Sequence, residues 1–379
     1  MSRHGGPGGP RSVKDGSAPD STDTAHMANY FITYSYLYHQ KDMLEDHKRT
    51  GAYYNACLQN RAQFSGKTVL DVGTGSGILA IFAAKAGARK VYAVEATSMA
   101  QHARRLVEAQ GLSDVVEVIQ GTIETVQIPE PVDIIISEWM GYFLLRESML
   151  DSVIVARDRF LAPGGALYPS HARMFLAPIR SQLAKQRAAD CAGSIEGWKE
   201  FAQDMKQYYD VDMTVLNKTY EDEQRDYFSR TAAWADVHPS QLLGPPVLLK
   251  SYDLLTVTLE ELKQDLHASF SMRIPQESSI EAFCGYFDVQ FRGSPANPAD
   301  SPVVLSTAPD ATGATHWGQQ VFFLHPPVVC TGPDVLTGTL DMARRADNHR
   351  LMDVKITFEH KGEGNGTDLL KRECLFHIE

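Results

Sequence analysis

Residues 68–80 read TVLDVGTGSGILA, and this stretch decides the fold of the first half of the chain. A short apolar run leads into three closely spaced glycines, Gly73, Gly75 and Gly77, and an Ala-rich segment follows. The pattern predicts a buried strand, a glycine turn and a helix. Because Ile78 stands where a dinucleotide fingerprint has its last glycine, the turn favours a nucleoside without phosphates.

Two further apolar runs continue this pattern. Residues 90–94 predict a second strand, and Glu95 follows it in the place where an acid can hold ribose hydroxyls. Residues 115–119 predict a third strand, and Glu124 beyond it either accepts a hydrogen bond from an adenine amino group or is a solvated loop acid. Strands that alternate with helical segments such as residues 97–110 predict a parallel sheet with right-handed crossovers.

The chemistry is expected in residues 137–148, which read SEWMGYFLLRES and follow the β-branched run 132–136. Ligands bind beyond the carboxyl ends of parallel strands, so Glu138 is well placed to meet one. Glu147 is expected at the start of a helix. The plainer interpretation of the two residues is a strand-end acid and a helix-capping acid.

The N-terminal part of the chain has two contrasting segments. Residues 1–27 are rich in Gly, Pro, Ser, Asp and Thr, which predicts a disordered tail. Residues 30–38 read YFITYSYLY and hold five aromatic side chains. They predict either an aromatic-faced helix that packs on a core or a lid over a ligand.

Composition narrows the class of protein. The chain has 379 residues, of which 43% are hydrophobic, and this favours about two globular domains with real cores. A formal charge of -11 argues against general nucleic-acid binding and favours basic partners. Five scattered cysteines lack zinc-type or redox-type spacing, so we expect reduced thiols in an intracellular protein and no metal site. No apolar run approaches the roughly 18 residues of a membrane span, and no leader for secretion is expected.

Several of these motifs together resemble one family, the protein arginine N-methyltransferases. The resemblance is carried by residues 69–77, Glu95, the loop with Glu138 and Glu147, and the distant Thr-His-Trp at 315–317, and it extends over residues 28–379. The chain is most similar to the plant protein arginine methyltransferase 10 group, through FLLR at 143–146 and YPSHARM at 168–174. Most relatives carry an aromatic residue where Arg146 stands.

The resemblance implies a two-part architecture. Residues 28–168 would form a Rossmann-like (α/β) S-adenosylmethionine-binding domain with an N-terminal lid helix, and residues 169–379 a β-barrel substrate domain. The apolar, β-prone runs at 247–252, 280–291 and 354–358 are typical of its antiparallel strands. Residues 187–238 would contain a helical dimerisation arm, and the alternative is a helical insert that packs on its own barrel.

Site residues follow from the same resemblance. Its implied cofactor contacts are Tyr30, Phe31, Tyr34, Met43, Arg49, Asp71, Gly73, Gly75, Gly77, Glu95, Ala96, Glu124 and Glu138. Its implied substrate contacts are Tyr34, Met43, Glu138, Met140, Tyr142, Glu147, His316 and Trp317. Glu138 and Glu147 would be catalytic, and Asp46 and His316 would approach each other as a proton-accepting pair. The family's histidine three residues before Met43 is Gln40 here, so its role is not carried over.

Paired carboxylates suit arginine chemistry. A guanidinium has a pKa above about 12 and is a poor nucleophile near neutral pH. Two glutamates that hold its edges by fork-like hydrogen bonds align one nitrogen with the sulfonium methyl and draw charge from it. Met43 stands where relatives that make asymmetric dimethylarginine have a methionine, so the resemblance implies a type I enzyme that makes mono- and asymmetric dimethylarginine.

The remaining expectations concern partners and competing functions. We expect a homodimer in cytoplasm and nucleus that acts on histones and Arg/Gly-rich proteins, without nucleic-acid or membrane binding, and releases S-adenosylhomocysteine. A small-molecule methyltransferase would share the cofactor domain but leaves the paired glutamates unexplained. An inactive binding relative is disfavoured, because no matched position is lost.

Overall fold

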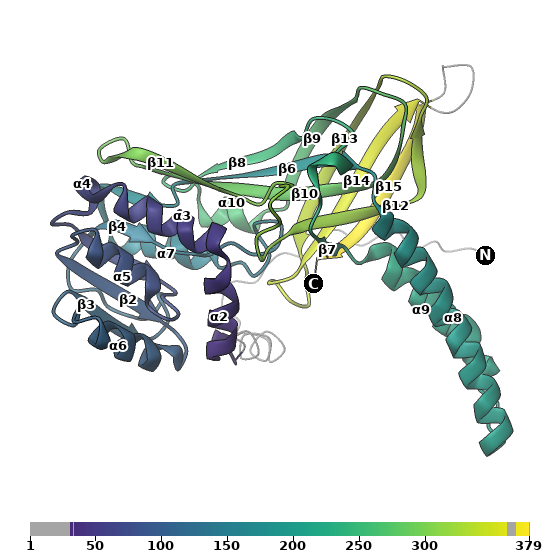
Figure 1. The fold of residues 1–379 in the computed structure, drawn as a ribbon, viewed down its shortest axis with the longest axis horizontal. Coiled ribbons are helices and arrows are strands. Elements are labelled where there is room, and N and C mark those ends of the chain that lie inside the picture. The colour runs from purple at the N-terminus through teal and green to yellow at the C-terminus, as the bar shows by residue number, and fades with distance from the viewer. Residues whose placement is uncertain (1–30, 33, 362–368, 379) are drawn as a thin grey trace, which may run out of the picture.

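The computed structural model describes residues 31–32, 34–361 and 369–378. The tail predicted for residues 1–27 and the cofactor contact predicted for Tyr30 lie outside them. The described chain forms a helix-and-sheet domain, a strand-rich domain, and a helical hairpin that extends from the second domain (Figure 1).

The first domain is built on five parallel strands in the order β3-β2-β1-β4-β5. The strands are β1 (Thr68–Val72), β2 (Lys90–Glu95), β3 (Val116–Gln120), β4 (Val132–Ile136) and β5 (Leu161–Tyr168). The helices are α2 (Leu37–Glu45), α3 (His47–Leu58), α4 (Arg61–Phe64), α5 (Ile78–Lys85), α6 (Met99–Ala109) and α7 (Leu150–Phe160). Every residue of β1 is buried, as expected for a central strand covered on both faces. The predicted parallel sheet is confirmed.

The order of the strands fixes where a ligand can bind. β1 pairs with β2 on one side and with β4 on the other, so the connections beyond β1 and β4 lead away in opposite directions. This switch point opens a crevice at the carboxyl ends of the two strands.

One detail of this domain differs from the prediction. α7 begins at Leu150, so Glu147 lies in the loop before the helix and not at its start. Glu147 and Ser148 have φ values of 81° and 58°, which a right-handed helix does not allow.

The second domain consists of antiparallel strands in two sheets, with the orders β7-β12-β10-β6-β8 (β11 pairs with β10) and β15-β14-β13-β9. The strands are β6 (His171–Ile179), β7 (Ala233–Ala235), β8 (Val247–Asp253), β9 (Leu266–Ile274), β10 (Ser278–Gly293), β11 (Pro298–Ser306), β12 (Gln319–Cys330), β13 (Asp334–Arg344), β14 (Met352–Lys361) and β15 (Leu369–Ile378). Short helices η2 (Pro239–Gln241) and α10 (Leu259–Lys263) connect them. β9 alternates buried and exposed residues along its whole length, as one-sided burial in an antiparallel sheet requires.

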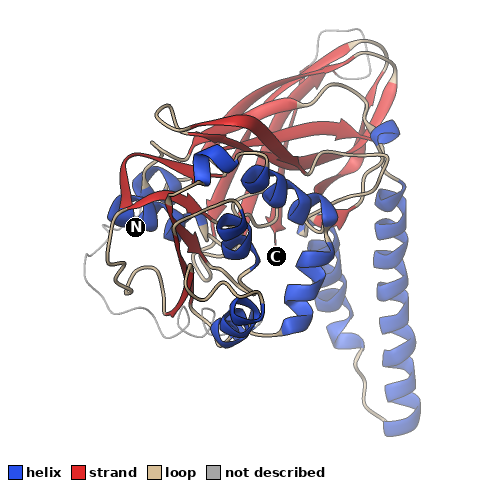
Figure 2. Ribbon diagram, turned by 60° about the vertical axis from the view of Figure 1, so that its left-hand side comes forward, coloured by secondary structure: helices blue, strands red, loops and turns tan. Residues whose placement is uncertain are grey.

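The helical hairpin consists of α8 (Gln182–Tyr209), η1 (Thr214–Leu216) and α9 (Asn217–Arg230). Its two long helices lie side by side and project from the barrel in both views (Figure 2). The arm was predicted at 187–238, but the helices begin at Gln182 and end at Arg230. The chain after Arg230 returns to the barrel, where β7 pairs with β12.

A continuous hydrophobic core joins the two domains. The ring of Tyr53 on α3 packs against Phe291 of β10 at a centroid distance of 4.9 Å, and Phe143 of the loop after β4 packs against Phe322 of β12 at 5.6 Å. The barrel therefore supports the loop that carries the predicted chemistry. Among the described residues, no helix is long and apolar enough to cross a membrane.

Candidate active site

A cavity lies at the switch point and collects most of the predicted site residues. Predicted residues on its wall are Phe31, Tyr34, Met43, Arg49, Gly73, Gly75, Glu95, Ala96, Glu124, Glu138, Met140 and Glu147. Predicted residues that do not line it are Asp46, Asp71, Gly77, Tyr142, His316 and Trp317. The cavity thus runs from the glycine turn after β1 to the two glutamates beyond β4.

The glycine turn and Glu95 form one end of the site. Gly73 and Gly75 have φ values of 71° and 54°, which favour glycine. The Glu95 carboxylate accepts hydrogen bonds from the backbone N–H groups of Gly75 (2.8 Å) and Thr97 (2.9 Å). Each oxygen keeps a lone pair, so Glu95 can still accept bonds from ligand hydroxyls.

Asp71 and Gly77 lie behind this turn. Asp71 is fully buried, and its Oδ2 accepts a hydrogen bond from Thr74 Oγ1 at 2.5 Å. Burial raises the pKa of Asp71 to about 7, although the Thr74 bond lowers it. Gly77 is the N-cap residue of α5 with φ 89°. Both residues shape the turn and neither lines the cavity, so their predicted direct contacts with the cofactor stay a prediction.

Gln40 on α2 is a wall residue that sequence reasoning missed. Its Oε1 accepts a hydrogen bond from the backbone N–H of Ser76 at 3.2 Å. A Cβ added at Gly75 would lie 2.7 Å from the same oxygen. Gln40 therefore docks α2 onto the glycine turn. In the sequence it was noted only as a departure from the family's histidine at that position.

Glu138 is paired with Arg49 rather than free. Arg49 Nε and Nη2 donate to Glu138 Oε2 at 2.9 and 2.6 Å, and Nη1 donates to the carbonyl of Met43 at 3.1 Å. Glu138 Oε1 accepts from the Met140 backbone N–H at 3.1 Å. Arg49 was predicted as a cofactor contact, and in this structure its guanidinium fixes the position of Glu138.

The loop from Glu138 to Ser148 has a constrained backbone. Its non-glycine residues with positive φ are Phe143, Leu144, Glu147 and Ser148. At Gly141, an added Cβ would lie 1.9 Å from the carbonyl oxygen of Arg146, so only glycine fits. Such conformations persist only where neighbouring structure enforces them.

The turn between β13 and β14 provides that enforcement. Glu147 N–H donates to the carbonyl of Arg350 at 2.8 Å, and Arg350 Nη1 donates back to the carbonyl of Glu147 at 2.6 Å. Ser148 Oγ donates to the carbonyl of His349 at 2.8 Å. The barrel thus holds the backbone of the second glutamate in place.

The Glu147 side chain points into the cavity with a partner on each oxygen. Tyr34 Oη donates to Oε2 at 2.8 Å, and Arg146 Nη1 donates to Oε1 at 3.0 Å. Burial raises the pKa of Glu147, and the charge of Glu138 adds to this, whereas Arg146, Tyr34 and Arg350 lower it.

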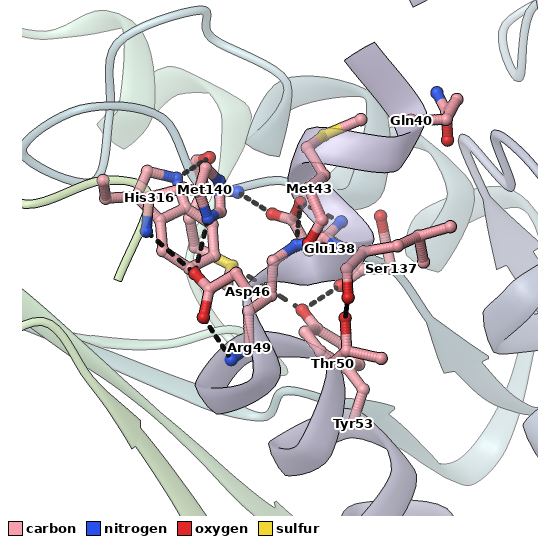
Figure 3. A network of polar contacts seen from close by, with 12 residues as sticks. Gln40, Met43, Asp46, Arg49, Thr50, Tyr53, Ser137, Glu138, Met140 and His316 are labelled. Carbon is pink, nitrogen blue, oxygen red and sulfur yellow. Dashed lines mark hydrogen bonds and ion pairs between the residues drawn. The ribbon is translucent and has the colours of Figure 1, made fainter. Parts of the chain in front are cut away.

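Asp46 and His316 meet beside the cavity. His316 Nδ1 lies 2.7 Å from Asp46 Oδ2, which also accepts the backbone N–H of His316 at 2.9 Å. Asp46 Oδ1 caps α3 by accepting the backbone N–H of Arg49 at 3.0 Å (Figure 3). Burial raises the pKa of Asp46, but the hydrogen bonds from His316 and Arg49 outweigh it and lower the pKa to about 2.

Trp317 and Tyr142 were predicted to contact substrate but lie away from the cavity wall. Trp317 is buried, and its Nε1 donates to the carbonyl of Met140 at 2.9 Å. Tyr142 faces the guanidinium of Arg146, with 5.3 Å between Cζ and the ring centroid. Trp317 therefore supports the glutamate loop through its bond to Met140, and Tyr142 supports Arg146.

Further polar or flexible wall residues were not predicted individually, although Thr74, Ser76 and Ser148 lie inside the two motifs quoted from the sequence. They are Thr74, Ser76, Thr97, Thr122, Ser148, Met149, Ser152 and Arg350. Ser152 Oγ donates to Glu124 Oε1 at 2.7 Å, which orients that carboxylate. A Cβ at Gly73 would lie 2.3 Å from Cε of Met149, so Met149 covers the glycine turn.

The parallel sheet, the glycine turn and the acid at the end of β2 define a methyltransferase domain. A methyltransferase-domain family matches residues 69–165, and the arginine methyltransferase oligomerization subdomain matches residues 170–363. The chain belongs to the protein arginine N-methyltransferase family.

Individual relatives are similar in sequence to most of the chain or nearly all of it. The protein arginine N-methyltransferase PRMT10 of Oryza sativa subsp. japonica is 54% identical over 340 residues, which are 89% of each chain. PRMT10 of Arabidopsis thaliana is 50% identical over 376 residues, which are 98% of each chain.

Solved structures are similar as well. The crystal structure of Arabidopsis thaliana protein arginine methyltransferase 10, described as a uniquely open conformation, has a TM-score of 0.87 at 50% identity and covers 92% of this chain and 100% of its own. The Trypanosoma brucei PRMT1 enzyme-prozyme complex with AdoHcy has a TM-score of 0.75 at 31% identity, with coverage of 92% and 100%. The resemblance to the plant group and the predicted fold class are both confirmed.

S-adenosyl-L-methionine is the cofactor, and the residues present fit it. Glu95 and Glu124 offer carboxylate oxygens at one end of the cavity, where a nucleoside's hydroxyl and amino groups need acceptors. Arg49 lies on the wall of the same cavity and offers a cation to the carboxylate of the cofactor. When bound, this cofactor supplies an electrophilic methyl group on a sulfonium.

Proposed function

We propose that this protein methylates the guanidinium nitrogens of arginine in proteins and produces monomethylarginine and then asymmetric dimethylarginine. The observation that carries the proposal is the placement of Glu138 and Glu147 on the wall of one cavity, next to the cofactor region. One glutamate comes from the end of β4 and the other from the constrained loop that the barrel holds.

The two glutamates would bind and orient the substrate. Each can accept charge-assisted hydrogen bonds from one edge of a guanidinium. Arg49 and the Met140 backbone fix Glu138, and Tyr34 and Arg350 fix Glu147, so both acceptors are positioned before the substrate arrives. Alignment of reacting atoms at roughly 3 to 3.5 Å can lower a barrier by about 7 to 11 kcal/mol, so positioning would supply much of the rate.

Within the Asp46–His316 pair, we assign the proton-accepting role to the histidine. The pKa of Asp46 is about 2, so this carboxylate stays ionised and is a weak base. It holds His316 through Nδ1, and Nε2 is then the ring atom that accepts a proton. Neither residue lines the cavity, so the proton would reach the pair after leaving the substrate.

Met43 supports the asymmetric product. Its side chain lines the cavity, and its carbonyl is held by Arg49. An unbranched, flexible thioether leaves room for a nitrogen that already carries one methyl group. The same nitrogen can then receive the second methyl.

We further propose a homodimer that acts on basic protein segments such as histone tails and Arg/Gly-rich regions. The formal charge of -11 favours cationic substrates. Exposed apolar side chains at the far end of the arm, Tyr208, Tyr209 and Val215, suit docking on a second copy. The five free cysteines favour a reducing compartment, and we place the protein in cytoplasm and nucleus.

One assay tests the proposal. Purified protein is incubated with labelled S-adenosylmethionine and an Arg/Gly-rich peptide or a histone tail, and the hydrolysed peptide is separated by chromatography. We expect label in mono- and asymmetric dimethylarginine. Label in symmetric dimethylarginine would overturn the type I assignment, and the absence of label in any arginine derivative would overturn the proposed activity.

A further inference from the structure

Arg146 precedes Glu147 in the loop and bonds its carboxylate from beside the cavity, whose wall Arg146 does not form. Its Nη1 donates to Glu147 Oε1 at 3.0 Å, and the two side chains are 22% and 19% exposed. Tyr34 donates to Oε2, so each oxygen of Glu147 already has one positioned donor and only one lone pair left for the substrate. A substrate guanidinium that approaches Glu147 therefore meets a cation of the chain's own.

Arg49 and Arg146, each of which bonds one of the two glutamates, are held very differently. The guanidinium of Arg49 makes three hydrogen bonds, two to Glu138 and one to Met43. The guanidinium of Arg146 makes one hydrogen bond within the described residues, and its Nε is buried without an acceptor. Leaving a buried donor unpaired is unfavourable, and Arg146 would regain water at Nε if it moved away. Arg146 is therefore the exchangeable arginine of the pair.

We propose that Arg146 is an internal competitor for the substrate arginine. It holds Glu147 Oε1 before substrate binds and leaves that oxygen when the substrate guanidinium arrives. The inference rests on the proposed arginine-methylating function. Two guanidinium ions repel each other at one carboxylate, and a substrate that makes fork-like contacts replaces a partner that makes a single bond. Arg146 thereby raises the substrate concentration that the enzyme requires.

The charges around Glu147 make this a specific effect. Tyr34 faces it from the segment before α2, Glu138 from the end of β4, Arg146 from its own loop, and Arg350 from the β13–β14 turn. In this group Arg146 donates to Oε1 of Glu147, and Tyr34 donates to Oε2. Its removal frees Oε1 and also takes away a charge that favours ionised Glu147.

The test compares steady-state kinetics of the full chain for a short Arg/Gly-rich peptide at saturating S-adenosylmethionine. In Arg146→Met we expect the peptide KM to fall about fivefold, which corresponds to about 1 kcal/mol, while kcat stays within about twofold at pH 8.5. The acid limb of the pH profile should move to higher pH. Arg146→Lys should restore the wild-type KM, because a lysine can make the single hydrogen bond that Arg146 makes.

Two further variants control for a folding defect and for the loss of one positive charge. Arg146→Gln is a second neutral variant in case the methionine disturbs folding, and Arg105→Met removes an equal charge from the exposed face of α6. We expect Arg105→Met to behave as wild type. An unchanged or higher KM in both neutral variants of an active enzyme would overturn the competitor role and leave the proposed function standing. An inactive wild type would overturn the proposed function itself.

Discussion

His316 approaches one oxygen of Asp46 with two nitrogens, its ring Nδ1 at 2.7 Å and its backbone N at 2.9 Å, across 270 positions of sequence. Asp46 is also the N-cap of α3, and the first turn of that helix carries Arg49 to Glu138. The loop before β12 and the helix that positions Glu138 are therefore joined through one carboxylate. Changes at Asp46 should affect both stability and catalysis.

Asp46→Asn should reduce stability in a pH-dependent way. The pKa of Asp46 is about 2 in the folded protein and 3.8 without its partners. A lowered pKa contributes stability that is complete above about pH 4 and is lost as the pH falls toward about 2. We expect a loss of up to about 2 kcal/mol at pH 6 that shrinks below about pH 4. Urea unfolding of the wild type and of Asp46→Asn, measured from about pH 6 down to about pH 2, gives this loss in the free energy of unfolding. A loss that does not change with pH would contradict the lowered pKa of Asp46.

Glu147→Gln should lower kcat by about a hundredfold or more, because the neutral amide no longer draws charge from the guanidinium. Its affinity for S-adenosylhomocysteine, measured by calorimetry, should change by less than about twofold. Glu138→Gln should also lose activity, but with a larger change in that affinity, because it releases Arg49. Glu45→Gln, which removes an exposed acid, is the control. Wild-type turnover in Glu138→Gln or Glu147→Gln would contradict the catalytic role of that glutamate.

Gln40→Ala should weaken cofactor binding, since it removes the acceptor for Ser76 N–H and detaches α2 from the glycine turn. A lost hydrogen bond of about 1 kcal/mol corresponds to roughly fivefold in the dissociation constant of S-adenosylhomocysteine. The peptide KM at saturating cofactor should stay near the wild-type value. An unchanged dissociation constant would show that Gln40 does not support the cofactor region.

Met43→Phe should shift the products toward monomethylarginine or symmetric dimethylarginine, because a rigid ring fills the space beside the reacting nitrogen. Met43→Leu conserves volume and should keep asymmetric dimethylarginine as the main product. Chromatography of hydrolysed peptide after long incubation distinguishes the three species. An unchanged product mixture in Met43→Phe would show that Met43 does not determine the product.

Replacing the arm, from Gln182 to Arg230, with a short linker should give a monomer with weakened activity. The double change Tyr208→Asp and Tyr209→Asp tests the same contact without removing helices, because both rings are exposed at the end of α8. Light scattering reports the mass, and Lys199→Ala on the same helix is the control. A fully active monomer would refute the dimer.

The regular part of the fold was accessible from the sequence. β4 runs from Val132 to Ile136 as the continuous β-branched run indicates, and β2 ends at Glu95 where the acid was expected. These features depend on local patterns, which burial on both faces imposes on consecutive residues.

The remaining differences have non-local causes. Nothing near Glu147 in sequence indicates that the backbone and guanidinium of Arg350, 203 positions away, would hold it outside a helix. Trp317 was predicted to contact substrate from its place in the Thr-His-Trp motif. In the structure its indole N–H instead donates a hydrogen bond to the carbonyl of Met140. Arg49 was assigned to the cofactor alone because its bond to Glu138 depends on how α3 lies against the end of β4.

The hydrogen bonds between the β13–β14 turn and the glutamate loop have a consequence for engineering. The conformation of Glu147 and Ser148 is not encoded in residues 137–148, since carbonyls of Arg350 and His349 complete it. Transplanting that loop into an unrelated methyltransferase would carry over both carboxylates without their arrangement. Arginine selectivity in this architecture depends on both domains together. A transplant would therefore have to include the barrel as well as the loop.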